Sequence, residues 1–206
     1  MTFRSLTLAA VLSTALIPAA VAMAEQADPA AQTIDAFDNA LLETMKQAKT
    51  LGVQGRYARL GPVVQAAFDL PTMTRFAVGP RWAALSAPEK ASLIKSFSRL
   101  SVANYAKNFD SYGGERITID PKVDTRGLDK LVRTHILSPG SKPVDLTYRM
   151  RQAADTKWKI IDVYYNGSIS ELTTRRSDFA GTMNDGGASA LVKKIDALAD
   201  KLVKTA

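Results

Sequence analysis

Two charged residues interrupt apolar patterns on either side of a turn near the end of the chain. Asp162 falls within WKIIDVYY, a run rich in strand-forming residues, and Arg176 lies on the apolar stripe of the helical segment that begins at Leu172. Between them, Asn166-Gly167 is a strong hairpin signal. A carboxylate and a guanidinium at these positions could form an ion pair, act in acid–base chemistry or bind an anionic ligand.

A regular register between the last two predicted strands places Asp162 opposite Leu146, on the buried face of the sheet. A buried carboxylate without a partner would cost several kcal/mol. We therefore predict a structural ion pair between Asp162 and Arg176 that fixes the last helix against the sheet, with Arg175 as the alternative partner. The other interpretation is that Arg176 binds the anionic headgroup of a ligand.

Composition excludes several other kinds of site. The chain has no cysteine, so it has neither a thiol nucleophile nor a thiolate metal site. Its one histidine, His135, is insufficient for a histidine-based zinc site, and on a predicted strand it is more often structural than catalytic. We expect no metal site and no cofactor. The net charge of +7 is dispersed along the sequence, which disfavours nucleic-acid binding and fits contact with anionic lipid surfaces or acidic partners.

The first residues have the pattern of a secretory signal peptide. Arg4 is a short positive region, residues 6–17 are apolar, and Ala22-Met23-Ala24 is a cleavage motif. The apolar run is short for a membrane span, which needs roughly 20 residues. We therefore predict a signal peptide at 1–24, a single domain at 25–206 and a periplasmic location.

The remaining chain alternates from helical to strand periodicity and back. Ser86-Ala87-Pro88-Glu89 is a capping box that opens the clearest helix, and Gly61-Pro62 predicts a break in an earlier one. These patterns predict an α+β fold, with a four-stranded antiparallel meander and helices laid on one face of the curved sheet. The predicted helices span 33–52, 57–68, 69–79, 86–109, 171–184 and 188–204, and the predicted strands span 115–123, 129–138, 143–151 and 157–165.

Four segments, in order, resemble the MlaC family of periplasmic lipid-binding proteins. They are VGPRWAALSAPEKASLIKSFSRLSVANYAKNF, VRTHILSPGSKPVDLTYRMR, WKIIDV and RRSDF. In the last segment Arg176, Ser177 and Phe179 match the family pattern, whereas Arg175 stands where an aromatic residue is common. The resemblance covers nearly all of the mature chain, and the run GSISELTTRRSDF is similar to the hopanoid-associated HpnM branch.

The resemblance implies a fold related to the NTF2-like cone, with a deep apolar cavity that holds lipid tails. It also implies a carrier, here expected to be a monomer, that shuttles hopanoid or phospholipid between the inner and outer membranes. Its expected partners are an inner-membrane transporter and an outer-membrane lipoprotein or complex.

Apolar residues on the inward faces of the predicted elements are the candidate lipid contacts, although ordinary core packing explains each of them as well. Two other classes of function stay open: an enzyme with Asp162 as general base beside Tyr148 or Tyr164, and an adaptor that binds only proteins. The candidate lining residues are Phe76, Trp82, Leu93, Phe97, Leu100, Tyr105, Leu146, Tyr148, Met150, Ile160, Tyr164, Leu172 and Phe179.

Overall fold

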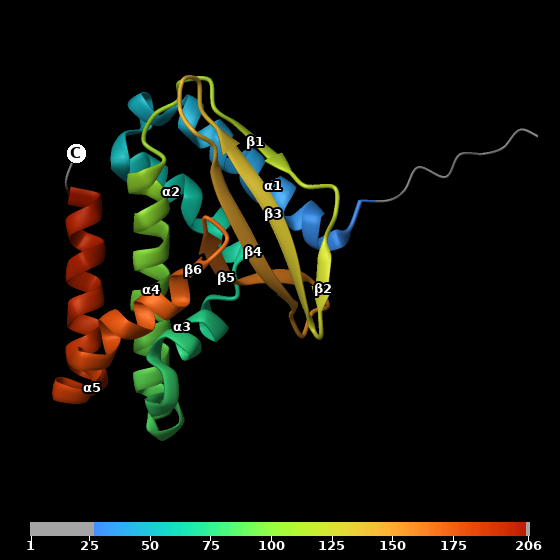
Figure 1. Ribbon diagram of the computed structural model, residues 1–206. Helices are drawn as coiled ribbons and strands as arrows, with labels where there is room; N and C mark the ends of the chain where they lie inside the picture. The colour runs from blue at the N-terminus through green and yellow to red at the C-terminus, as the bar shows by residue number, and fades with distance from the viewer. Residues whose placement is uncertain (1–26, 205–206) are drawn as a thin grey trace, which may run out of the picture.

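Helices form both ends of the described chain and an antiparallel sheet forms its middle, which confirms the predicted α+β fold (Figure 1). The computed structural model describes residues 27–204, so the predicted signal peptide at 1–24 lies outside the described residues. The helices are α1 (Pro29–Lys46), α2 (Ala48–Ala67), α3 (Leu70–Val78), the 3-10 helix η1 (Gly79–Ala84), α4 (Ala87–Asn108) and α5 (Glu171–Lys204). The strands are β1 (Arg116–Ile119), β2 (Asp124–Arg126), β3 (Asp129–Leu137), β4 (Val144–Gln152), β5 (Trp158–Tyr165) and β6 (Ile169–Ser170).

The sheet contains two short strands that the sequence patterns did not predict. Its order is β1-β3-β4-β5-β6, with β2 also paired to β3, and the pairings between neighbouring strands are antiparallel. The strand predicted over 115–123 ends at Ile119, just before Pro121, which has no N–H to donate to a ladder. After the turn at Asn166-Gly167, β6 pairs with β5 through two residues, a short strand that no alternating pattern in the sequence indicates.

The register between β4 and β5 differs from the predicted one by a two-residue shift of the pairing and by a one-residue bulge. Met150 pairs with Ile160, but Arg149 pairs with Asp162, which leaves Ile161 as an extra residue on β5. Because side chains alternate between the two faces of a strand, this extra residue moves Asp162 to the face opposite Tyr148. Leu146 faces Tyr165 rather than Asp162, so the prediction that Asp162 lies on the core face was wrong.

The sheet's core face packs against an aromatic cluster supplied by the helices. The ring of Phe37 on α1 lies 5.3 Å from that of Phe68, 5.2 Å from that of Tyr105 and 6.3 Å from that of Tyr148, measured between centroids. Edge-to-face contacts at these distances add to the burial of large apolar surfaces. This cluster joins α1, α2, α4 and β4 into one core.

The last helix lies beside α4, and its two segments meet at a glycine. Gly187 has φ +65°, a backbone conformation that favours glycine, and α5 breaks there as Gly186-Gly187 predicts. Figure 1 shows the segment after the break running alongside α4, and Phe97 on α4 contacts Phe179 on α5. Within residues 27–204, no helix has both the length and the apolar character that a membrane span requires.

The earlier helices begin largely where their caps predict. The Asp69 side chain accepts a hydrogen bond from the Thr72 amide at the start of α3, and Ser86 and Glu89 form the predicted capping box of α4. The predicted break at Gly61-Pro62 was wrong, because α2 continues through Pro62, whose side chain is exposed. The departure from helical geometry lies at Gly52 instead.

A carboxyl group is buried on α1 without a hydrogen-bond partner. Asp38 is 4% exposed, and neither of its side-chain oxygens is hydrogen-bonded within the described part of the chain. Burial, assisted by the nearby charge of Asp35, raises the pKa of Asp38 from 3.8 to about 8. The folded protein therefore holds this group protonated at neutral pH.

Asp38→Asn should remove a pH dependence of folding. The unfolded chain ionises this carboxyl near pH 3.8, whereas the folded protein protonates it up to about pH 8, so stability falls as the pH rises across that window. Within this window, the free energy of unfolding falls by about 1.4 kcal/mol for each pH unit. Denaturant unfolding of wild type, Asp38→Asn and the exposed control Asp110→Asn between pH 4.5 and pH 8.5 measures this loss. Parallel pH profiles for wild type and Asp38→Asn would contradict the assignment.

Candidate functional site

The first candidate site is a pocket of about 530 Å³, here called the apolar pocket, between the sheet and the helices. Leu146 and Val163 supply its sheet side, and Tyr105 and Phe109 supply its α4 side. A volume of this size lies within the range of small-molecule binding pockets. Its lining residues are Phe68, Met73, Ser101, Asn104, Tyr105, Asn108, Phe109, Ile136, Val144, Leu146, Val163, Tyr165, Ile169, Glu171, Thr174 and Arg175.

Exposed apolar side chains lie on the hairpin that borders the apolar pocket. Tyr165 is 47% exposed and Ile169 is 56% exposed, and both also line the pocket. Large apolar side chains that are exposed next to a pocket often mark a surface that a ligand or another molecule covers when it binds. This border can therefore contact an apolar ligand as it enters.

Few charged groups line the apolar pocket. Burial raises the pKa of Glu171, and the guanidinium of Arg175, 3.7 Å from it, partly opposes that shift. Burial also raises the pKa of Tyr105, so its hydroxyl stays protonated. The pocket thus offers an apolar surface with a small number of polar groups, an arrangement suited to an amphiphilic ligand.

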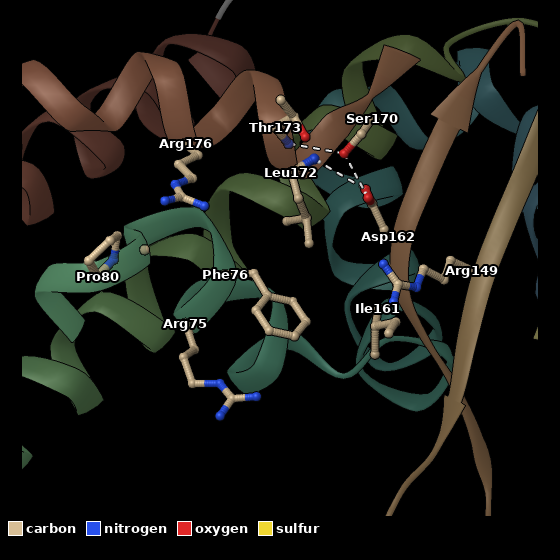
Figure 2. A pocket seen from close by; sticks show the side chains of 11 residues that line it. Arg75, Phe76, Pro80, Arg149, Ile161, Asp162, Ser170, Leu172, Thr173 and Arg176 are labelled. Atoms are coloured by element: carbon tan, nitrogen blue, oxygen red, sulfur yellow. Dashed lines mark hydrogen bonds between the residues drawn. The ribbon is translucent and has the colours of Figure 1, made fainter. Parts of the chain in front are cut away.

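The second candidate site is a pocket of about 610 Å³, here called the arginine pocket, where α3 and the start of α5 meet the sheet (Figure 2). Three arginines line it, one each from α3, β4 and α5. The complete lining is Arg75, Phe76, Gly79, Pro80, Arg149, Ile161, Asp162, Ser170, Leu172, Thr173 and Arg176.

Asp162 holds the first turn of α5 rather than pairing with an arginine. It is 6% exposed, and its Oδ1 accepts hydrogen bonds from the amides of Val163 (2.8 Å) and Leu172 (3.2 Å). Its Oδ2 accepts a hydrogen bond from the Ser170 hydroxyl at 2.7 Å, and Ser170 Oγ in turn accepts one from the Thr173 amide at 3.0 Å. Ser170 and Asp162 together cap the helix. Figure 2 shows the hydrogen bonds that join Asp162, Ser170 and the first turn of α5.

The predicted ion pair between Asp162 and Arg176 is therefore wrong, and so is the alternative with Arg175. Arg176 is exposed and lies against Gly79, where a Cβ atom would stand 2.9 Å from the Arg176 Nε. Arg175 lines the apolar pocket and pairs with Glu171. The bulge places Asp162 on the face opposite Tyr148, where backbone amides and a hydroxyl satisfy it.

The structure distributes the predicted lining residues among several environments. Tyr105 and Leu146 line the apolar pocket, whereas Phe76 and Leu172 line the arginine pocket. Trp82 is half-buried against the core. Tyr164 pairs with Thr147 on the face opposite Tyr148, so its inward assignment was wrong. The others are buried in the core and line neither of these two pockets: Leu93, Phe97, Leu100, Tyr148, Met150, Ile160 and Phe179.

Sequence reasoning missed part of the apolar pocket. Ile136 and Val144 face each other across β3 and β4, and both line the pocket together with Leu146. The alternation that identified Leu146 also contains Val144, so this residue could have been found from its spacing. Phe109 ends the α4 pattern, and only the fold brings it to the pocket.

His135 lies outside both pockets, in a hydrogen-bonded arrangement. Its Nδ1 lies 2.7 Å from Asp145 Oδ1 and its Nε2 lies 2.9 Å from Asp120 Oδ1. The hydrogen bonds to Asp145 and Asp120 raise the pKa of His135. Residues 27–204 contain no group of three or more side chains placed to hold a metal ion.

A double-mutant cycle tests the new role of Asp162. Asp162→Ala leaves the Leu172 amide without its acceptor, so we expect a loss of about 1–3 kcal/mol in the free energy of unfolding. Arg176→Ala removes an exposed side chain, so its effect should stay below about 0.5 kcal/mol. The two effects should add in the double variant. Denaturant unfolding measures all three variants. A coupling energy above about 1 kcal/mol between the two substitutions would contradict this role and support the ion pair.

Comparison with known proteins gives a family match and a structural match. The model of the family described as MlaC protein matches residues 35–197. No curated protein matches the chain. Among solved structures, the chain is similar to a phospholipid-binding protein from Ralstonia solanacearum, solved in complex with a phospholipid, with a TM-score of 0.73 at 21% sequence identity. That match covers 84% of this chain and 98% of the other, and it shows a shared fold. Because the family model spans most of its length, the chain belongs to the MlaC family.

Proposed function

We propose that this protein is a periplasmic lipid carrier that holds lipid tails in the apolar pocket and shuttles them between the inner and outer membranes. The observation that carries this proposal is the pocket itself, about 530 Å³ of space lined by residues of β3, β4, β5, β6, α3, α4 and the start of α5. Its sheet side is apolar, and its polar groups lie mostly on the helices. An amphiphilic molecule can place its apolar tail along the sheet and its polar end near the polar side chains of α4 and α5.

The physical need for such a carrier follows from the cost of exposing lipid to water. Transfer of one methylene group out of an apolar environment costs about 0.8 kcal/mol, so thirty methylenes cost on the order of 24 kcal/mol. Unaided transfer between membranes is therefore very slow. A carrier must replace the bilayer with apolar walls, which the lining residues Leu146, Ile136 and Phe109 supply here.

The comparisons support the ligand class. The structurally similar protein from Ralstonia solanacearum is described as phospholipid-binding and was solved with a phospholipid. Membership of the MlaC family supports a periplasmic location, in agreement with the signal peptide predicted at 1–24. We propose the same partners as the sequence resemblance implies: an inner-membrane transporter that exchanges lipid with this carrier, and an outer-membrane lipoprotein or complex.

The enzymatic alternative loses its main support in the structure. Asp162, the general base of that hypothesis, has both oxygens engaged by the Val163 and Leu172 amides and the Ser170 hydroxyl. A general base needs a lone pair directed at substrate. Of its two suggested neighbours, Tyr148 is buried in the core on the opposite face of the sheet, whereas Tyr164 lies on the same face as Asp162. A binding role fits these contacts better than a catalytic one.

Leu146→Arg should abolish lipid loading. The change places a charge on the sheet side of the apolar pocket, where a lipid tail cannot solvate it. Thr118→Arg, on an exposed position of β1, is the matched control. Mass spectrometry of extracted lipid should find as much lipid per protein in the control as in wild type. We expect Leu146→Arg to carry less than about a tenth of that amount, because burying an arginine against lipid tails weakens binding by more than about 1.4 kcal/mol.

Folding must be checked in the same samples, by circular dichroism and thermal unfolding. If Leu146→Arg does not fold, Val144→Gln serves instead, because Val144 lines the same pocket and is only half-buried. Folded variants that carry as much lipid as wild type would overturn the assignment of this pocket.

Competition identifies the lipid class. The similarity of GSISELTTRRSDF to the HpnM branch favours a hopanoid, a rigid polycycle, over phospholipid. We expect a hopanoid to displace a fluorescent phospholipid from the purified, delipidated protein. A rigid polycycle needs one broad cavity, whereas two acyl chains can occupy separate clefts. Displacement by unlabelled phospholipid alone, at matched concentrations, would assign phospholipid as the ligand.

A further inference from the structure

We propose that the arginine pocket binds a phosphate group, either as a free anion or as part of a phosphorylated headgroup. Arg75, Arg149 and Arg176 come from three different elements and line one pocket of about 610 Å³ (Figure 2). Guanidinium groups bind phosphate oxygens through paired, charge-assisted hydrogen bonds. Lipid tails in the apolar pocket do not account for this second site, because the two pockets share no lining residue.

Two of the three guanidinium groups have donors available for a ligand. Within residues 27–204, Arg75 and Arg176 form no hydrogen bond or ion pair with a protein group. The Arg75 guanidinium lies 5.0 Å from the centre of the Phe76 ring, a cation–π contact that positions the group and leaves its N–H groups free. Arg176 lies against Gly79, which has no side chain to displace it.

The third arginine is anchored before any ligand arrives. Arg149 Nε donates to Asp129 Oδ2 at 2.6 Å, and Asp129 also accepts from Arg151. Burial opposes ionisation of Asp129, but the hydrogen bonds from Arg151 and Arg149 lower its pKa overall. Arg149 is therefore held in place by a permanent charge, and binding would cost it little conformational entropy.

The one carboxylate in the arginine pocket does not occupy the arginines. Asp162 directs its oxygens at the amides of Val163 and Leu172 and at the Ser170 hydroxyl. The amides at the start of α5 are thereby capped, so the site does not depend on a free helix N-terminus. Asp129 balances the charge of Arg149, but Arg75 and Arg176 outnumber Asp162, so the pocket lining carries a net positive charge.

The apolar lining strengthens the attraction for an anion. Phe76, Ile161 and Leu172 share the pocket with the arginines. An anion that lies against these apolar side chains is partly shielded from water, which strengthens its interaction with the guanidinium groups relative to that in bulk water. A phosphate can accept paired hydrogen bonds from one guanidinium group, and the positive charges of the other arginines that line the pocket add to the attraction.

Titration of delipidated protein with inorganic phosphate tests the site without any lipid. Isothermal titration calorimetry at constant ionic strength, with chloride as the balancing anion, gives the dissociation constant. We expect Arg176→Gln and Arg75→Gln each to weaken phosphate binding about tenfold, because each removes a positive charge and its unpaired donors from the pocket lining. The matched control is Arg126→Gln, which removes an exposed arginine on β2 outside the pocket.

A parallel measurement identifies the source of the phosphate. Wild type and the double variant Arg75→Gln/Arg176→Gln are loaded with phosphatidic acid or with diacylglycerol, which lacks the phosphate. Selective loss of phosphatidic acid by the double variant assigns the site to a headgroup, and loss of inorganic phosphate binding alone assigns it to a free anion; either supports the proposal. Equal phosphate binding and equal phosphatidic acid loading in wild type and double variant would overturn it. Diacylglycerol loading reports on the apolar pocket separately, so failure of the carrier proposal is distinguishable.

Discussion

The carboxylate of Asp162 ties the sheet to the last helix, and the geometry of both pockets depends on it. A one-residue bulge turns this side chain away from the core face, where it accepts hydrogen bonds from the Leu172 amide and the Ser170 hydroxyl. The first turn of α5 is therefore fixed to β5. Residues on one side of that turn line the apolar pocket and residues on the other line the arginine pocket, so one capping interaction positions both sites.

The apolar pocket arises because the helices cover the core face of the sheet incompletely. Near the middle of the sheet, Tyr148 and Met150 are sealed by the aromatic cluster around Phe37. Towards the ends of β4 and β5 the strands extend beyond that cluster, and Leu146 and Tyr165 face a space bordered by α4 and the β6 hairpin. The same apolar face is thus a packed core in one part and a ligand site in another, which lets a stable fold hold a cavity.

Local patterns predicted the elements well because their signals are local: the capping box at Ser86 and the break at Gly187 need only neighbouring residues. The resemblance to the MlaC family was confirmed by the family match. The site was harder to predict, because a bulge changes which face every later residue occupies, and no local pattern marked Ile161 as an extra residue. Periodicity identifies apolar faces, as it did for Leu146 and Phe97, but it does not tell a packed position from an open one.

The central claim is that lipid tails occupy the apolar pocket between the sheet and α4. The most direct measurement is photo-crosslinking with a lipid that carries a diazirine on its acyl chain, followed by peptide mass spectrometry to locate the modified residues. The account predicts that crosslinks concentrate on residues such as Tyr105, Ile136 and Leu146, and that unlabelled lipid suppresses them. Crosslinks confined to the groove between α1 and α2, around Ala36 and Val63, or scattered over the surface would contradict it.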